Sequence, residues 1–336
     1  MKLLVDMPVH PAALAELQTF SGVHIHCVEN PAEESREIDP RLLRGVQALF
    51  CTRPPANFND FDALQWIQLS STGYSQIHGL DLVSRGIRVT NARGCFDVPI
   101  AEWNIAMMVN LGRNLRTMIR NQEQGVWDRS AIFQSELRGS VIGLWGYGGI
   151  GRETARMAKQ LGLTVHVLTR KPVGPRGLMY AVPGTGDPEG NLPDRMFRPD
   201  ESAEFLQGLD FLIIAVPLTS ATEGMIGEHE LRQLPRSAYV LNPSRGPIIQ
   251  RAALLKALRE NWIAGAALDT HYQYPTPPDD EFWGLPNLIF TPHISGSSLN
   301  PNFLTRIWNI QLQNTRRFVQ HEPLLNELTP SQLQGD

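Results

Sequence analysis

A glycine-rich stretch in the middle of the chain has the spacing of a phosphate-binding turn. The segment VIGLWGYGGIG places Gly146, Gly148 and Gly151 in the pattern GxGxxG directly after an apolar run, with Gly149 and Ile150 between them. In such a pattern the first glycine permits a tight turn, the second lets the backbone approach a pyrophosphate, and the third lets helix and strand pack closely. The anion then lies at the N-terminus of the following helix. The pattern predicts a dinucleotide site; the alternative is a purely structural turn.

The residues at the end of the next strand bear on the choice of cofactor. An NAD site usually has an acidic residue about 20 positions beyond the glycines, where it binds the ribose hydroxyls. Thr169, Arg170 and Lys171 stand there in this chain. Guanidinium and ammonium groups pair with a 2′-phosphate, which a carboxylate would repel. We therefore expect NADP(H) as the favoured cofactor. The alternative is NAD(H), with Arg170 stacked on the adenine and Lys171 solvated.

Two further stretches carry side chains suited to binding an acid and moving a proton. Arg245 lies in NPSRGPI and His293 in TPHISGSS, and each stretch follows a strand-like run. Open α/β sheets bind their ligands at the carboxyl ends of strands. There Arg245 could hold a carboxylate through two hydrogen bonds, and His293 could exchange a proton near neutral pH. Taken alone, each residue also fits a structural role, Arg245 as a surface or capping residue and His293 as a hydrogen-bonded structural histidine.

These side chains need a scaffold, and the sequence alternates between two kinds of element. Short apolar, β-rich runs recur with helical patterns between them, which favours parallel sheets with helical crossovers. The runs are LLVD, VQALFC, WIQLSS, IRVTN, VIGLW, LTVHVLT, FLIIAVP, AYVLNPS, IAGAALD and LIFTPH. A chain of 336 residues is long enough for two domains. We expect an α/β fold.

Two apolar stripes at spacings of three and four residues predict long helices. The first follows Pro99 and would form one helix linking two domains; the second closes the chain and is expected to pack on the first domain. The first consists of Ile100, Trp103, Met107, Leu111, Leu115 and Met118, the second of Phe303, Ile307, Ile310 and Phe318. From Lys171 to Pro199 the chain is rich in Pro and Gly without periodicity, which is typical of a functional or mobile loop.

The composition excludes several classes of partner. A net charge of −4 gives no reason to expect nucleic acid or an anionic membrane. Cys27, Cys51 and Cys95 lie far apart without CxxC spacing, so we expect buried, reduced thiols and neither a disulfide framework nor a metal site. The N-terminal MKLLVDMPVH lacks an unbroken apolar core, and no run reaches the length of a membrane span. We expect a cytoplasmic protein.

Several motifs occur in an order that resembles a known family. LSSTGYSQI and GIRVTN are followed by VPIAEWNIAMMVNLGRNL, GYGGIG, AVPLTSATEGMIG, NPSRGPI, GAALD and LPNLIFTPHISGSS. Over nearly its whole length the chain resembles the D-isomer-specific 2-hydroxyacid dehydrogenases, which include glycerate, glyoxylate/hydroxypyruvate and phosphoglycerate dehydrogenases. The resemblance implies two Rossmann-like doubly wound domains: a substrate domain of residues 1–98 and 293–336, and an inserted dinucleotide-binding domain of residues 99–292. It also implies a homodimer formed through the nucleotide-binding domain.

The resemblance assigns roles to particular positions. It makes the protein an NAD(P)-dependent oxidoreductase that transfers hydride between nicotinamide and C2 of a small 2-hydroxy or 2-oxo acid. Arg245 looks like the substrate-orienting arginine and His293 like the acid/base. Asp269 matches the residue that contacts the nicotinamide carboxamide. Further positions that it assigns to the cofactor are Val216, Pro217, Asn242 and Ser244. It assigns binding of the substrate carboxylate to the backbone N–H groups of Ser71, Thr72 and Gly73. Arg53, in CTRPP, either adds a positive charge for an anionic substrate or is a solvated loop arginine.

One position departs from the family pattern. The family has a catalytic Glu five residues beyond the acid of the LD pair and just before a Pro; Tyr274 stands there, followed by Pro275. That Glu keeps the histidine protonated, whereas a tyrosine hydroxyl is neutral at neutral pH. We therefore expect His293 to titrate near or below its ordinary value of about 6.5.

Three explanations of the missing carboxylate stay open. Reduction could proceed with a lower pH optimum while Tyr274 orients His293. A neutral His293 could suit a reaction that starts as oxidation. Asp279, Asp280 or Glu281 could replace the Glu. Two other functions also remain: an oxidation coupled to isomerisation, and a non-catalytic nucleotide-sensing scaffold. The substrate is expected to be a small anion, with carboxylate, phosphate and phosphonate all open.

Overall fold

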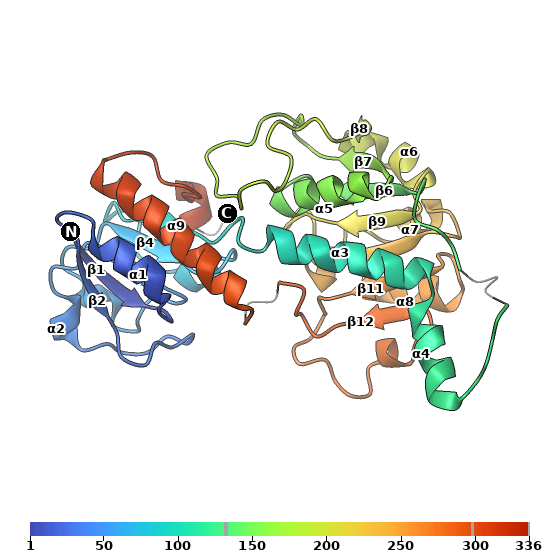
Figure 1. The fold of residues 1–336 in the computed structure, drawn as a ribbon, viewed down its shortest axis with the longest axis horizontal. Coiled ribbons are helices and arrows are strands. Elements are labelled where there is room, and N and C mark those ends of the chain that lie inside the picture. The colour runs from blue at the N-terminus through green and yellow to red at the C-terminus, as the bar shows by residue number, and fades with distance from the viewer. Residues whose placement is uncertain (131–133, 297–298, 335–336) are drawn as a thin grey trace. The chain divides into compact units, whose positions relative to one another are not determined.

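The chain folds into two compact units. The computed structural model describes residues 1–130, 134–296 and 299–334. The first unit consists of Met1–Phe96, Gly177–Val182 and Ser298–Asp336, and the second of Asp97–Arg176 and Pro183–Ser297. Each unit contains one parallel sheet flanked by helices (Figure 1). The predicted α/β class is confirmed.

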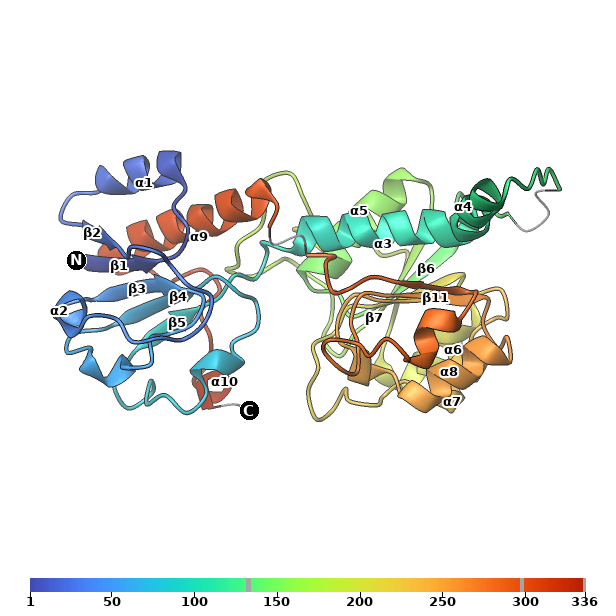
Figure 2. The same cartoon turned by 90° about the horizontal axis from the view of Figure 1, so that it is seen from below.

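The first unit is built on a sheet with the strand order β2-β1-β3-β4-β5. These strands are β1 (Lys2–Asp6), β2 (His24–Cys27), β3 (Ala48–Cys51), β4 (Trp66–Leu69) and β5 (Arg88–Thr90). Helices α1 (Pro11–Gln18) and α9 (Pro301–Val319) cover one face of the sheet (Figure 2), and α2 (Pro40–Leu43) and α10 (Pro330–Gln334) belong to the other. Because successive side chains of a strand point to opposite faces, Leu3 packs with α1 and α9 while Leu4 packs with α2 and α10. Burial of both faces explains the unbroken apolar runs in the sequence.

The second unit has a sheet with the order β12-β11-β10-β9-β6-β7-β8. Its strands are β6 (Val141–Trp145), β7 (Thr164–Leu168), β8 (Arg195–Phe197), β9 (Phe211–Ile214), β10 (Tyr239–Asn242), β11 (Gly265–Leu268) and β12 (Leu288–Phe290). Its helices are α3 (Asp97–Gly112), α4 (Leu115–Gln124), α5 (Gly149–Gln160), α6 (Ser202–Gln207), α7 (Glu228–Gln233) and α8 (Arg251–Arg259). The chain winds outward from β6 to β8 and then returns to β9 beside β6. This reversal is the point at which such sheets bind ligands.

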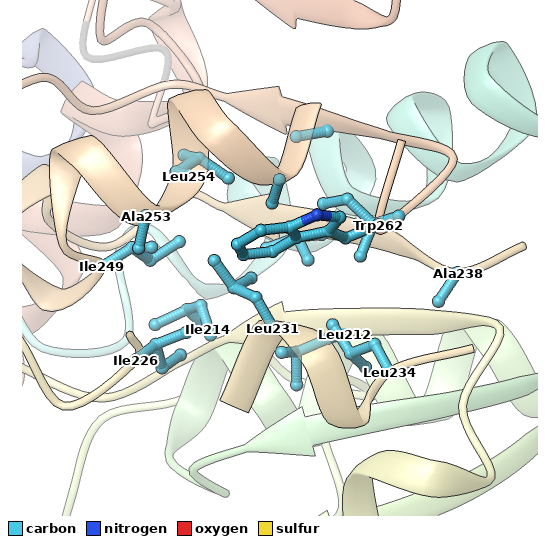
Figure 3. Packing of buried hydrophobic residues seen from close by; sticks show 14 of the residues in the cluster. Leu212, Ile214, Ile226, Leu231, Leu234, Ala238, Ile249, Ala253, Leu254 and Trp262 are labelled. Atoms are coloured by element: carbon cyan, nitrogen blue, oxygen red, sulfur yellow. The ribbon is translucent and has the colours of Figure 1, made fainter. Parts of the chain in front are cut away.

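Helices α3 and α5 lie on one face of the second sheet, and α6, α7 and α8 on the other (Figure 2). The second of these faces is packed around Trp262, which lies among Ile214, Leu231 and Leu254 (Figure 3). Burial of such side chains contributes about 1.5–3 kcal/mol each. The core thereby fixes the carboxyl ends of the strands, where the candidate site residues follow.

Most predicted elements are confirmed, and the differences have local causes. Each apolar run forms a strand, but β2 and β8 were missed because both are edge strands with polar or exposed residues. β8 also falls inside the segment expected to lack regular structure. The helix after Pro99 was wrongly predicted to be continuous: Asn114 adopts φ 49°, which ends α3 and starts α4. Leu115 is consequently exposed rather than part of a buried stripe.

The three cysteines form no disulfide, and all lie within the described residues. Cys51 and Cys95 are buried, whereas Cys27 is only half-buried because β2 lies at the sheet edge. In the part of the chain that the structure covers, no helix combines the length and apolar character needed to cross a membrane.

The two units differ from the expected domain boundaries in two places. His293 groups with the second unit and not with the first, because Asp269 at the end of β11 binds the turn that carries it. Gly177–Val182 groups with the first unit although the chain around it belongs to the second. Tyr180 is buried there, and its N–H donates to the Asn326 side chain at 3.1 Å. The boundary expected after residue 98 lies next to the observed one at Phe96.

Candidate active site

The glycine-rich turn between β6 and α5 has the shape that a pyrophosphate requires. Gly146 adopts φ +106°, and a Cβ there would lie 2.5 Å from the Ala215 carbonyl oxygen. A Cβ at Gly151 would lie 2.7 Å from the Gly146 carbonyl oxygen, so helix and turn pack closely only with glycine. A Cβ on Gly148, by contrast, would meet no described atom within 4 Å. The backbone is therefore open at the one position where a phosphate must approach, and the turn fits a dinucleotide.

The neighbouring strand ends supply the remaining predicted cofactor positions. Arg170 and Lys171 are exposed just beyond β7, with half-buried Thr169 before them. Val216 and Pro217 follow β9. Ile150 lies in the first turn of α5. The structure thus brings these positions to the carboxyl edge of one sheet, around the glycine turn.

The segment after β10 is ordered by its own polar side chains. Asn242 is buried; its amide nitrogen donates to the Arg245 carbonyl at 2.9 Å and its amide oxygen accepts from the Ser244 N–H at 3.0 Å. The Ser244 hydroxyl donates to the Ile214 carbonyl at 2.9 Å, which ties the segment to β9. Arg245 is exposed, and its guanidinium donates to the Ser244 carbonyl at 2.7 Å. Asn242 and Ser244 therefore shape the turn that presents Arg245.

His293 stands in a turn that the buried carboxylate of Asp269 organises. One Asp269 oxygen accepts from the Thr291 hydroxyl at 2.6 Å and from the Ile294 N–H at 2.9 Å, and the other accepts from the Ser295 N–H at 2.9 Å. His293 itself adopts φ 58°, a left-handed conformation that is uncommon for residues other than glycine. The Asp269 hydrogen bonds on both sides of His293 hold this conformation. Asp269 is fully buried, and in this structure its carboxylate accepts hydrogen bonds from the turn that carries His293.

Tyr274 contacts His293 through its ring and not through its hydroxyl. The two ring centroids lie 5.5 Å apart with an interplanar angle of 51°. The Tyr274 hydroxyl instead accepts a hydrogen bond from the His271 N–H at 3.0 Å. Tyr274 therefore places an aromatic ring beside the imidazole.

The pKa of His293 lies below its ordinary value. Desolvation is the largest cause: the residue as a whole is exposed, but its ring is partly desolvated against Tyr274. The positive charge of Arg245 lowers the pKa further, Asp269 acts in the opposite direction, and His271 lowers it again. Arg245 follows β10 and His293 follows β12, so both stand at the carboxyl edge of the second sheet. The neutral imidazole is the form expected near neutral pH.

Two of the three candidate replacement carboxylates are engaged elsewhere. Asp280 is ion-paired with Arg251 at 3.2 Å and accepts from the Phe282 N–H at 2.9 Å. Glu281 is ion-paired with Arg259 and, at 3.5 Å, with Arg251. These pairs hold both carboxylates against α8.

The first unit brings its own predicted residues together. Arg53 follows β3 and Ser71–Gly73 follow the adjacent β4. The two loops are joined by a Thr52–Ser70 hydroxyl pair at 2.9 Å. The carbonyls of Ser71 and Thr72 accept from the Ala92 N–H at 2.9 Å and the Asn91 side chain at 2.8 Å. Among the described residues, the N–H groups of Ser71–Gly73 donate to no other group, which suits an anion.

Comparison with known proteins places this arrangement in a family. Residues 105–295 match the profile described as "D-isomer specific 2-hydroxyacid dehydrogenase, NAD binding domain". A glyoxylate reductase of Thermofilum pendens is 30% identical over 89% of this chain and 86% of its own length. The chain belongs to the D-isomer specific 2-hydroxyacid dehydrogenase family. It is therefore an oxidoreductase with an NAD(P)-binding domain, as the resemblance implied.

Other matches agree with this assignment. A glyoxylate reductase of Thermococcus gammatolerans is 31% identical to this dehydrogenase over 72% of the chain and 70% of its own length. A D-isomer specific 2-hydroxyacid dehydrogenase family protein of Aeromonas salmonicida shares the fold, with a TM-score of 0.78, 24% identity and 98% of each chain covered.

Sequence reasoning gave no role to His271 in this dehydrogenase. Its side chain is buried beside Tyr274, with ring centroids 5.7 Å apart, and its Nε2 lies 2.8 Å from the Thr291 carbonyl oxygen. His271 thus supports Tyr274 through its N–H and the His293 turn through its ring. A polar residue directly after β11, in LDTHY, was the available signal.

Proposed function

We propose that the protein catalyses hydride transfer between NADP(H) and C2 of a small 2-hydroxy or 2-oxo acid. The observation that carries the proposal is that Arg245, His293 and the open glycine turn all follow strands of the second sheet at its carboxyl edge. The nicotinamide cofactor, when bound, supplies or accepts the hydride. The chain's own residues hold the acid and move the proton.

Each residue has a separate task. Arg245 holds the carboxylate and the C2 oxygen through charge-assisted hydrogen bonds. His293 gives a proton to the C2 oxygen during reduction and accepts it during oxidation. Asp269 holds the turn in which His293 stands, because it binds the backbone after that residue. The N–H groups of Ser71–Gly73 and the charge of Arg53 are proposed to bind the substrate carboxylate.

The pKa of His293 decides the favoured conditions in each direction. Because that pKa is lowered, the protonated form that reduction needs is populated only at acid pH. The neutral form that accepts a proton from a hydroxyl is abundant at neutral pH. We therefore propose that reduction is fastest at acid pH and that oxidation is efficient already at neutral pH.

The choice of NADP(H) and of a small 2-oxo acid has separate support. Arg170 and Lys171 stand exposed where a 2′-phosphate would lie, and no carboxylate occupies that position. Several relatives carry the name glyoxylate reductase. We propose glyoxylate and its close 2-oxo acid homologues as the first substrates to examine.

The test compares binding and turnover in the same preparation. NADPH and NADH binding is measured by fluorescence titration, and turnover is followed with glyoxylate, hydroxypyruvate, phenylpyruvate, 2-ketogluconate and oxaloacetate from about pH 5 to about pH 9. The blank is His293→Ala, and the matched control is His229→Ala on the exposed face of α7. Turnover that rises toward acid and disappears only in His293→Ala supports the proposal. Cofactor binding without turnover of any acid contradicts it and favours a nucleotide sensor.

We further propose that the protein forms a homodimer through the second unit. Large apolar side chains are exposed on and around α4, with Trp127 exposed by 87% and Ile119 by 47%. Burial of such a surface stabilises a subunit interface. Ile119→Glu should shift the sedimentation coefficient to that of a monomer, whereas Val83→Glu, an exposed apolar position of the first unit, should not. A monomeric wild-type protein would contradict this proposal.

A further inference from the structure

The segment between β7 and β8 is bound tightly to the glycine turn of its own unit. Tyr147, inside the GxGxxG pattern, donates its hydroxyl to Asp187 at 2.7 Å. Arg152, directly after the pattern, donates to the carbonyls of Asp187 and, at 2.7 Å, of Gly174. All three side chains that make these contacts are at least nine-tenths buried. The segment, expected to be either a functional or a mobile loop, is therefore anchored beside the glycine turn.

Asp187 is ionised in this arrangement. Burial acts to raise its pKa, but the Tyr147 hydroxyl and the N–H groups of Leu192 and Asn191 outweigh burial and bring the pKa below its ordinary value. The next helical residue, Glu153, binds the Gly186 N–H and is ion-paired with Arg156 at 2.7 Å. The fixed charges on the segment and on the start of α5 are thus paired.

The same segment delivers Arg176 to a second buried carboxylate. Arg176 donates its N–H to the Pro188 carbonyl at 2.7 Å, which fixes its position, and its guanidinium lies 3.1 Å from Asp97. The Asp97 and Arg176 side chains are only 10% and 8% exposed. Asp97 begins α3, so this pair joins α3 to the segment.

Asp97 lies directly against the glycine turn. A Cβ on Gly149 would clash with the Asp97 carboxylate, lying 1.9 Å from its nearest oxygen. Gly149 is the first residue of α5 and follows Gly148, the open position of the turn. A buried negative charge therefore stands beside the helix N-terminus at which the pyrophosphate anion would bind. An unneutralised negative charge there would act against an anion bound at this helix N-terminus, because like charges repel more strongly where water is excluded.

We propose that Arg176 is a positioning residue for cofactor binding: it neutralises Asp97 and thereby makes the N-terminus of α5 acceptable to the cofactor pyrophosphate. The inference rests on the proposed cofactor site. Arg176 acts through Asp97, so its loss weakens the affinity for NADPH and NADH alike. This distinguishes it from Arg170 and Lys171, whose proposed contact is specific to the 2′-phosphate.

The experiment is a double-mutant cycle on the dissociation constants of NADPH and NADH. Arg176→Gln should raise both constants by about tenfold or more, since it removes the positive charge that lies against Asp97. In the double variant, which carries Asp97→Asn as well, both dissociation constants should return to within about threefold of wild type. Asp97→Asn alone should lower both dissociation constants. Arg176→Lys keeps the charge and should restore most of the affinity. Arg195→Gln, which removes an exposed arginine paired with Glu204, is the matched control.

Kinetics separate this electrostatic role from a structural one. In Arg176→Gln the KM for NADPH should rise while kcat at saturating cofactor stays near wild type. Dissociation constants equal to those of Arg195→Gln, or no recovery on adding Asp97→Asn, would overturn the proposal. If Arg176→Gln does not fold, Asp97→Asn alone decides: a raised dissociation constant overturns the inference. If wild type binds neither nucleotide, the proposed function has failed and not only this inference.

Discussion

The ring of Tyr274 lies 5.5 Å from that of His293, while the Tyr274 hydroxyl binds the His271 N–H. Tyr274 thus offers the imidazole an aromatic ring, while its hydroxyl serves the backbone of His271. If Tyr274 orients His293, it therefore does so through its ring, because its hydroxyl is bound by the His271 N–H. A neutral His293 agrees with the direction of its pKa.

A carboxylate placed at position 274 should change the pH dependence of reduction. In Tyr274→Glu the negative charge favours the imidazolium, so the pKa of His293 rises and the protonated form persists to higher pH. At a pH above the His293 pKa of both wild type and variant, each unit by which the pKa rises increases the protonated fraction about tenfold. The pH profile of reductive kcat/KM measures the shift. Tyr274→Phe keeps the ring and should leave the profile unchanged. An equal shift in that variant would show that the carboxylate charge is not what raises the pKa of His293.

The wild-type pH dependence should have opposite signs in the two directions. Protonated His293 is lost as pH rises through the lowered pKa, so reductive kcat/KM falls about tenfold for each further pH unit. Oxidative kcat/KM rises through the same pKa and then levels off. Titration of the His293 ring by NMR should give the same midpoint as both kinetic profiles. A midpoint above the ordinary histidine value would contradict the desolvated site.

Removing the Asp269 charge should disorder the His293 turn. Asp269→Asn replaces one acceptor oxygen by an amide group that cannot accept from the surrounding N–H groups, at a cost of about 1–3 kcal/mol. We expect a lower unfolding temperature and a loss of kcat. Asp279→Asn, an exposed acid of a nearby loop, is the matched control. Retention of full kcat in Asp269→Asn would show that His293 does not depend on this carboxylate.

The second glycine of the turn should be needed for the cofactor and not for folding. In Gly148→Ala the new methyl group enters space that no described protein atom occupies, so the unfolding temperature should stay near wild type. The methyl group blocks the approach of a phosphate, so the dissociation constant of NADPH should rise by about tenfold or more. Gly208→Ala also adds a methyl group in open space and should change neither quantity. Unchanged affinity in Gly148→Ala would place the pyrophosphate elsewhere.

Arg170 should matter for one cofactor only. Arg170→Ala removes a charge-assisted contact worth about 1.5–3 kcal/mol, so NADPH binding should weaken by about tenfold or more while NADH binding changes little. Arg198→Ala, at another exposed arginine of the same unit, serves as the control. Equal weakening of both nucleotides would favour the alternative in which Arg170 stacks on the adenine.

The sequence by itself determined the elements and the order of the motifs. Buried parallel strands are apolar on both faces, so runs such as VIGLW and FLIIAVP can be recognised without tertiary information. The glycine spacing is equally local, because a tight turn and a close approach each demand glycine at a fixed position. Edge strands such as β8 were missed because only one side of each is paired, so their sequences stay partly polar.

Only the tertiary structure decided how charges far apart in the sequence meet. Asp97 and Arg176 are separated by 79 positions, and Asp269 and Ser295 by 26, yet each pair is in contact. Nothing in the local sequence distinguishes such residues from solvated ones, because burial and pairing depend on how helices and loops pack onto the sheet. For the same reason the sequence located a tyrosine before Pro275, but only the fold placed its ring against His293 and its hydroxyl against the His271 N–H.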